Sequence, residues 1–332
     1  MARPKIGLVL GSGAARGISH IGILRIIEKL HIPIDIIVGT SMGAIIGGAY
    51  AAGNSLKKIE DSFCDINWLK ILKMIAPSRL QWEGLFDGDN IKDFIKARIG
   101  EHRIEKLNTK FACVATDIWK GDEIVLEKGS LIDALRASMS IPLFFSPVKI
   151  GGRYLVDGGV VNPVPVDVAR KLGADIVIAV VVTRNINQFT TQMSKESINT
   201  HYTPVPGSKF DNMSNDLAFN TDLTDIKSKL DVKSEKEDSL SITQHMNRVS
   251  IIMGNTLLNM RLAAAPPDIL IRPNTDKYKL TDFTKAEEFI ELGEEAARLS
   301  LSNEIMARLI KEYKRKSFYK KIIPKFLNRC QN

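Results

Sequence analysis

Cysteine is scarce in this chain, and the three that occur lie far apart. They are Cys64, Cys113 and Cys330, and no two of them form a Cys-x-x-Cys pair. An odd, dispersed set of cysteines argues against a disulfide-stapled fold and against a zinc site, and it favours a reducing compartment. The chain has 332 residues, of which 44% are apolar and 25% charged, as expected for one large or two modest globular domains.

The chain also has little net charge outside its last 22 residues. The total is +8, and residues 311–332 alone carry eight basic side chains against one acidic side chain. The nearly neutral remainder argues against a surface that binds nucleic acid. Within 311–329, apolar residues recur every three or four positions between the lysines, until Pro324 interrupts them. We expect this basic tail to attach to an anionic membrane surface; the alternative is that its apolar stripe packs on the domain.

Long hydrophobic segments are missing as well. Residues 36–56 are uncharged, but five glycines among them suit a buried strand, turn and helix better than a bilayer helix. The first residues, Met-Ala-Arg-Pro-Lys, lead into a short apolar run without the features of a secretory signal. We therefore expect a cytoplasmic protein that can lie peripherally on the inner face of a membrane.

The order of the apolar runs predicts an α/β fold. Residues 5–10 are a continuous apolar run, typical of a strand buried on both faces of a parallel sheet. Helical spacing then continues to about residue 31, and a second strand follows at 34–38. Further strands are expected near 110–116, 123–126, 175–183 and 268–271, and helices over 42–52, 89–99 and 242–260. This alternation indicates a mainly parallel sheet covered by helices.

The composition divides the chain into four parts. Residues 5–183 form the expected α/β core, and we expect residues 184–240, which are polar and lack sustained periodicity, to be a mobile insertion. Residues 241–310 are expected to add helices and a strand that pack on the core, and 311–332 is the basic tail. Thr284-Lys-Ala-Glu287 has the spacing of a capping box, which predicts that the last long helix begins there.

A glycine-rich loop follows the first strand. It contains Gly11, Ser12, Gly13, Ala14 and Arg16. Amide hydrogens at such a strand-to-helix turn can hold a phosphate or a developing oxyanion. A dinucleotide fingerprint requires a small sixth residue, but Arg16 occupies that position, so this alternative is weak. The loop taken alone leaves an oxyanion site and an ordinary turn as alternatives.

A second motif, Gly39-Thr-Ser41-Met-Gly43, follows the second strand and opens a glycine-rich helix. A Gly-x-Ser-x-Gly sequence between a strand and a helix is typical of a nucleophile elbow, in which a sharp turn exposes the serine oxygen. The small residues Gly39 and Gly43 avoid clashes in the crowded backbone. Ser41 is therefore the candidate nucleophile.

Few side chains are available as the base for this serine. Only five histidines occur, and only His20 lies near the glycine loop, where a structural histidine is more common than a catalytic one. The best carboxylate is Asp157, which ends an apolar strand and precedes Gly158 and Gly159, glycines that let the backbone approach another loop. An isolated Asp-Gly pair would ordinarily be an Asx turn.

Taken together, the glycine-rich loop, the GTSMG elbow and the DGG turn resemble those of the patatin-like phospholipases, in particular bacterial members. The resemblance extends over about residues 5–183, including LRASMSIPLFFSPV and GGRYLVDGGVVNPVPVDVARKLGADIVIAV. It implies a three-layer α/β fold with a Ser41–Asp157 dyad and no histidine. It also implies an oxyanion hole made by amides of residues 11–14 and supported by Arg16. Here the loop has fewer glycines than is common in the family.

The resemblance further implies a lipid acyl hydrolase, a phospholipase or esterase that forms an acyl-serine and needs no metal or cofactor. Its expected partner is a lipid or phospholipid ester. Two alternatives remain open. An acyltransferase would use the same acyl-serine with an alcohol or lysolipid acceptor, and a membrane-associated binding protein would keep the fold without turnover. The presence of both Ser41 and Asp157 argues against the second alternative.

Overall fold

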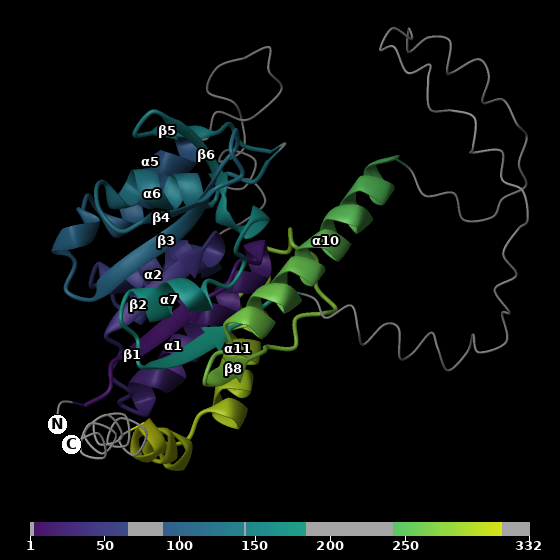
Figure 1. Cartoon of the computed structure of the whole chain (residues 1–332). Coiled ribbons are helices and arrows are strands. Elements are labelled where there is room, and N and C mark those ends of the chain that lie inside the picture. The colour runs from purple at the N-terminus through teal and green to yellow at the C-terminus, as the bar shows by residue number, and fades with distance from the viewer. Residues whose placement is uncertain (1–2, 66–88, 143, 184–241, 314–332) are drawn as a thin grey trace, which may run out of the picture. The chain divides into compact units, whose positions relative to one another are not determined.

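The computed structural model describes residues 3–65, 89–142, 144–183 and 242–313 (Figure 1). The chain divides into two compact units, residues 1–184 with 253–332, and residues 185–252. The first unit contains every residue of the predicted catalytic motifs, and the following description concerns that unit. Of the second unit, only the first half of one helix, residues 242–252, is described.

An eight-stranded sheet forms the centre of the first unit. Its strands are β1 (Ile6–Leu10), β2 (Ile36–Thr40), β3 (Lys110–Asp117), β4 (Glu123–Leu126), β5 (Val148–Ile150), β6 (Arg153–Asp157), β7 (Ile176–Val180) and β8 (Ile269–Ile271). They follow the order β5-β6-β3-β2-β1-β7-β8, and β4 pairs with β3 outside this path. Strands β3, β2, β1, β7 and β8 are each parallel to the next in this order. The pairs β3–β4, β3–β6 and β5–β6 are antiparallel. The predicted mainly parallel sheet is confirmed.

Helices cover both faces of this sheet (Figure 1). They are α1 (Ser19–Lys29), α2 (Met42–Ala51), α3 (Leu56–Cys64), α5 (Asp89–Ile99), α6 (Leu131–Ser138), α7 (Val166–Lys171), α11 (Ala286–Ser300) and, from residue 253 on, α10 (Ile242–Ala264). One cluster of buried side chains joins the sheet to α1, α2, α3, α5, α6 and α11. A second cluster, on the other face, joins it to α7 and to Leu258 of α10. The result is the three-layer α/β architecture that the family resemblance implies.

The burial of β1 explains its continuous apolar sequence. Leu8 and Leu10 belong to the first core cluster, whereas Val9 between them belongs to the second. Successive side chains of a strand point to opposite faces, so a strand covered on both faces needs apolar residues at every position. A run such as Ile6–Leu10 is therefore what a central strand of this sheet requires.

The capping box predicted at Thr284 is wrong. Helix α11 begins at Ala286, its N-cap residue is Lys285, and no side chain caps it. The amide of Lys285 donates to the carbonyl of Asp282, which places Thr284 inside a turn before the helix. Glu287 and Glu288 nevertheless lie in the first turn of the helix, where acidic side chains interact favourably with the helix dipole.

Two of the predicted segments fall where the structure gives no description. The polar insertion at 184–240 lies outside the described residues, and so does the basic tail from residue 314. The start of the tail, residues 311–313, is helical, and the hydroxyl of Tyr313 donates to Asp175 at 2.7 Å. None of the helices within the described ranges combines the length and apolarity that crossing a bilayer requires.

Candidate active site

Ser41 occupies a sharp turn between β2 and α2. Its backbone has φ 56° and ψ −121°, a region that non-glycine residues rarely adopt. The Ser41 carbonyl already accepts hydrogen bonds from the amides of Ala44 and Ile45, so the helix begins directly after it. Such strain persists only where surrounding contacts enforce it, and it is typical of a nucleophile elbow. The Ser41 residue is 5% exposed.

Two glycines make room for this turn. A Cβ atom at Gly43 would lie 2.1 Å from the carbonyl oxygen of Leu10, in the strand that leads to the glycine-rich loop. A Cβ atom at Gly39 would lie 2.5 Å from the amide nitrogen of Ala44. Both contacts are to backbone atoms, which cannot move aside as a flexible side chain can. Glycine at 43 therefore lets the elbow pack directly against β1, and glycine at 39 lets β2 turn sharply into α2.

Asp157 lies at the end of β6, and both of its carboxylate oxygens are engaged. The Ser41 hydroxyl donates to Oδ2 at 2.5 Å, and the amide of Gly159 donates to Oδ1 at 2.7 Å. The Asp157 amide donates to the carbonyl of Ser140 at 2.9 Å, which ties the end of the strand to the loop after α6. The Asx turn that an isolated Asp-Gly pair suggests is present, and the same carboxylate also contacts the serine.

Burial raises the pKa of the Asp157 carboxyl to about 6, against the opposing effect of its hydrogen bonds from Ser41 and Gly159. The residue is 6% exposed, and removal from water disfavours its charged form. An efficient base has a pKa close to the working pH, because it is then both deprotonated and basic enough to accept a proton. At pH 7 the Asp157 carboxyl is ionised and is a stronger base than an exposed aspartate.

This pKa predicts how the activity depends on pH. If Asp157 must be deprotonated, kcat/KM should be level above about pH 6 and should fall about tenfold for each pH unit below it. The measurement is a pH profile with a soluble ester whose own charge does not change over pH 4.5 to 8. Circular dichroism at each pH controls for unfolding. A profile that stays level down to pH 5 in folded protein would show that Asp157 is not the base.

The amides of the glycine-rich loop are not equivalent. The amide of Gly11 donates to the carbonyl of Val180 at 3.1 Å, and that of Ser12 donates to the carbonyl of Pro163 at 2.9 Å. These two predicted oxyanion donors are therefore engaged within the fold, because the end of β7 and the segment before α7 bind them. Within the described residues, the amides of Gly13 and Ala14 donate no hydrogen bond. The remaining candidate oxyanion donors are therefore the amides of Gly13 and Ala14.

Ala14 adopts a conformation that favours glycine, with φ 46°. Left-handed backbone of this kind is costly for a residue with a side chain and is found where neighbouring contacts hold it in place. Just after it, the Ala15 amide donates to the carbonyl of Leu280 at 3.1 Å. The Arg16 guanidinium donates to the carbonyl of Tyr278 at 2.6 Å and 3.1 Å. The loop is thus anchored to residues 278–280, which sequence patterns did not connect with it.

His20 contacts the loop rather than the serine. Its Nε2 lies 2.8 Å from the carbonyl oxygen of Gly11, and the residue is fully buried. Burial lowers the pKa of its imidazole to about 4, so the ring is neutral at pH 7 and Nε2 donates to that carbonyl. His20 therefore holds the peptide group that precedes Ser12, as expected of a structural histidine.

The residues of this site match one family model. It is the model of the patatin-like phospholipases, and the match covers residues 8–170. Residues 8–170 belong to the patatin-like phospholipase family. The match includes the glycine-rich loop, the elbow and the DGG turn, and it confirms the family resemblance.

Several curated proteins are similar to this chain. An uncharacterized NTE family protein of Mycobacterium tuberculosis is 36% identical over 183 residues, which is 53% of this chain and 49% of that protein. Patatin-like phospholipase domain-containing protein 6 of Homo sapiens is 35% identical over 181 residues, covering 53% of this chain and 13% of that protein. Lysophospholipase NTE1 of Kluyveromyces lactis is 28% identical over 302 residues, covering 87% of this chain and 18% of that protein. The chain thus spans half or less of these relatives.

One short segment of the patatin-like domain joins all three motifs. The Thr40 hydroxyl, next to Ser41, donates to the carbonyl of Asn162 at 3.0 Å. The backbone amide of Asn162 donates to the carbonyl of Gly158 at 2.8 Å. The next carbonyl, that of Pro163, accepts from Ser12 in the glycine-rich loop. The Asn162 side chain is fully buried, and its amide nitrogen donates to the carboxylates of Glu123 and Asp167. Residues 158–163 therefore set the positions of the three motifs relative to one another.

Sequence patterns missed Asn162, and they missed the positioning role of Ser138. The Ser138 hydroxyl donates to the carbonyl of Val114 at 2.7 Å and accepts from the Ser41 amide at 3.0 Å. It lies at the end of α6, a helix that we did not predict. A signal was present, because Ser130 caps this helix and Asp133 follows three residues later, as in a capping box. For Asn162, no local pattern distinguishes it from an ordinary asparagine beside a proline.

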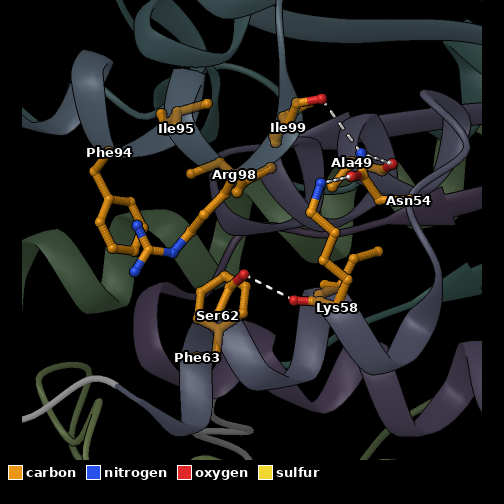
Figure 2. Close-up of a pocket in the computed structure, with 11 residues that line it drawn as sticks. Ala49, Asn54, Lys58, Ser62, Phe63, Phe94, Ile95, Arg98 and Ile99 are labelled. Atoms are coloured by element: carbon orange, nitrogen blue, oxygen red, sulfur yellow. Dashed lines mark hydrogen bonds between the residues drawn. The ribbon is translucent and has the colours of Figure 1, made fainter.

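A pocket lies away from the dyad, between α2, α3 and α5 (Figure 2). Most of its walls are apolar side chains, and Lys58 and Arg98 lie among the lining residues. The guanidinium of Arg98 stacks on the ring of Phe94, 3.5 Å from its centroid (Figure 2). Neither Ser41 nor Asp157 lines this pocket, so it supplies no reacting group for ester chemistry.

Proposed function

We propose that the patatin-like domain is a lipid acyl hydrolase with Ser41 as nucleophile and Asp157 as base. One observation carries the proposal: the Ser41 hydroxyl, in a strained elbow, donates to the buried Asp157 carboxylate at 2.5 Å. A nucleophile and a base within hydrogen-bond reach are the minimal apparatus of covalent acyl transfer. The lysophospholipase name of the Kluyveromyces lactis relative supports a lipid ester as the substrate class.

The reaction proceeds in two halves. As Ser41 Oγ attacks the ester carbonyl carbon, its proton passes to Asp157 and a tetrahedral oxyanion forms. Collapse of this intermediate breaks the bond to the leaving alcohol, which receives the proton from Asp157. Water then attacks the acyl-serine and gives its proton to the same carboxylate. The second collapse returns that proton to Ser41 and releases the fatty acid.

The oxyanion is stabilised from two sides. The amides of Gly13 and Ala14 have no other acceptor among the described residues and are the donors we assign to it. Helix α2 begins directly after Ser41, and its N-terminus favours negative charge. A fixed donor aimed at the developing charge contributes about 10²–10³ in rate. Arg16 and His20 support the loop from behind through the carbonyls of Tyr278 and Gly11.

The proposal includes where the protein works. We place it in the cytoplasm, lying on the inner face of a membrane that presents its lipid substrate. The +7 charge of the tail, residues 311–332, would attract anionic lipids at about 1 kcal/mol per basic residue near the surface. The 2.7 Å hydrogen bond from Tyr313 to Asp175 joins the beginning of this tail to the domain.

A lipid mixture tests the proposal and its alternatives together. The wild-type chain and Ser41→Ala would be incubated with mixed phospholipids, lysolipids and neutral esters in the presence of glycerol, and the products identified by mass spectrometry. Free fatty acid and deacylated lipid should appear with the wild type only. An excess of newly acylated glycerol or lysolipid over free acid would make the protein an acyltransferase. No product from folded wild-type protein would favour a binding protein without turnover.

A further inference from the structure

Large apolar side chains are exposed around the strand that ends at Asp157. We name this group the rim patch. It consists of Ile118, Trp119, Phe144, Tyr154 and Val160, and Trp119 is 82% exposed. Scattered apolar residues on a surface need no explanation, but an exposed group of aromatic residues around one site is typical of an interaction surface.

Backbone pairing brings two parts of the rim patch together. Strand β6 pairs antiparallel with β3, with Asp157 opposite Ala115 and Leu155 opposite Asp117. Beyond the last pair, the Ile118 amide donates to the carbonyl of Tyr154 at 3.0 Å. The turn that carries Ile118 and Trp119 therefore lies beside Tyr154. Asp157 lies three positions after Tyr154, which is about 10 Å along an extended strand.

The other two members are attached to Asp157 more directly. Val160 lies in the short helical turn, residues 158–160, that follows Asp157 in the chain. Phe144 lies in the loop after Ser140, whose carbonyl accepts the Asp157 amide. All five side chains are thus carried by segments that contact the Asp157 strand or continue from it.

The rim patch lies at the edge of the sheet where Ser41 lies. Strands β2 and β3 are parallel, with Thr40 opposite Val114, so their carboxyl ends meet at the same edge. Ser41 follows directly after β2, and the turn with Trp119 follows the end of β3. In open α/β sheets, ligands bind at this edge. A surface touching the rim patch would therefore be close to the dyad.

Around the patch, the described charged side chains that form no ion pair are two lysines. The acidic side chains of the turn, Asp117 and Asp122, both lie near Arg153, at 3.1 Å and 3.6 Å. Lys120 and Lys149 are exposed and form no ion pair within the described part of the chain, and Lys149 Nζ lies 5.4 Å from the Tyr154 ring centroid. Aromatic side chains flanked by lysines suit the boundary between lipid headgroups and acyl chains.

We propose that the rim patch is the surface by which the domain contacts an anionic lipid bilayer, so that a lipid ester reaches Ser41 without crossing water. This rests on the proposed function for its biological sense, but the binding it predicts is independent of turnover. The basic tail would act at longer range through charge, whereas the rim patch inserts apolar groups. Salt should weaken the contribution of the tail and not that of the rim patch, because at 1 M the Debye length is only about 3 Å and attraction between charges is screened.

The test uses the full chain with Ser41→Ala, so that vesicles are not consumed. Sedimentation with vesicles of phosphatidylcholine and phosphatidylserine would be measured at 0.1 M and 1 M NaCl. Adding Trp119→Ala and Tyr154→Ala should weaken binding about tenfold, and the difference should persist at 1 M salt. The matched control is Leu299→Ala, which removes a side chain 80% exposed on α11 and should change nothing.

A second variant and a second readout keep the test decisive. Trp119→Gln alone, at an exposed turn, cannot unfold the domain and should also weaken binding. Brominated lipids should quench the fluorescence of Ser41→Ala protein more than that of the same protein with Trp119→Phe. With Ser41 intact, Trp119→Ala with Tyr154→Ala should leave turnover of a water-soluble short-chain ester unchanged.

Several outcomes would overturn the proposal. Binding that is unchanged in both rim variants, or that falls equally in Leu299→Ala, would show that this patch does not contact lipid. If the wild type is a dimer without lipid and the rim variants are monomers, the patch is a contact between copies of the chain. A wild type that turns over no ester would contradict the proposed function, while the vesicle data would still decide the patch.

Discussion

Ser41→Ala is expected to lower kcat for ester hydrolysis by roughly 10⁴- to 10⁶-fold. The physical reason is that no other hydroxyl in the described structure combines an elbow conformation with a hydrogen bond to a buried carboxylate. Removing the nucleophile ends covalent catalysis and leaves only what oxyanion donors and binding contribute. The measurement is turnover of a soluble ester, together with fluorophosphonate labelling and mapping of the modified peptide.

Labelling should occur at Ser41 and disappear in Ser41→Ala. The matched control is Ser62→Ala on α3, whose hydroxyl donates only to the Lys58 carbonyl and which should label and react as the wild type does. Ser138 is the instructive competitor, because its hydroxyl is close to the Ser41 amide yet is committed to the carbonyl of Val114. A label at Ser138 or Ser140 would refute the assignment of the nucleophile.

Asp157→Asn is expected to lower kcat nearly as much as Ser41→Ala does, and at least by the 10²–10⁴ typical of a lost general base. Asparagine can still accept from the Gly159 amide and contact the Ser41 hydroxyl, but it cannot take the proton. Groups that act as one unit have non-additive effects, so the double variant should be no worse than Ser41→Ala alone. Steady-state kinetics of the three variants test this.

Although Asp157→Asn lowers activity, it should increase the stability of the folded protein relative to the wild type as the pH rises. The folded pKa of Asp157, about 6, is above the ordinary value of 3.8, so the folded state binds its proton more tightly than the unfolded state. The contribution of Asp157 to the free energy of unfolding of the wild type is therefore greatest below pH 4 and declines as the pH rises to about 6. At about 1.4 kcal/mol per unit of pKa difference, the total loss is roughly 3 kcal/mol. Asparagine does not titrate. The melting temperature of Asp157→Asn minus that of the wild type should therefore be greater at pH 8 than at pH 4.

His20→Ala is the control that separates the dyad from a conventional triad. Nε2 of His20 is occupied by the Gly11 carbonyl, and the low pKa of its buried ring, about 4, makes it a weak base. A folded His20→Ala protein should keep kcat within about tenfold of the wild type, since only support of the loop is lost. A loss of several hundredfold in folded protein would favour a histidine base instead.

Local patterns were sufficient for the elbow and for every strand except β5, which the sequence analysis did not predict. Strand β1 is buried on both faces, so every residue of Ile6–Leu10 had to be apolar, and that run is visible in the sequence. The turn at Ser41 needs glycine on both sides because backbone atoms approach there, so its signature lies within five consecutive residues. Its position at a strand end before two glycines made Asp157 the best candidate carboxylate, and the family resemblance gave it the role of base, since an isolated Asp-Gly pair is ordinarily an Asx turn.

What the patterns could not supply depends on contacts between distant segments. Ser41 and Asp157 are 116 residues apart, and their 2.5 Å hydrogen bond follows from the order β6-β3-β2, which no local periodicity encodes. Whether an amide in the glycine-rich loop is free depends on the carbonyls of Val180 and Pro163, which belong to other segments. The raised pKa of Asp157 likewise comes from burial by the assembled layers. Residue types and their local spacing are written in the chain, whereas hydrogen-bond partners and desolvation exist only once the sheet has brought these segments together.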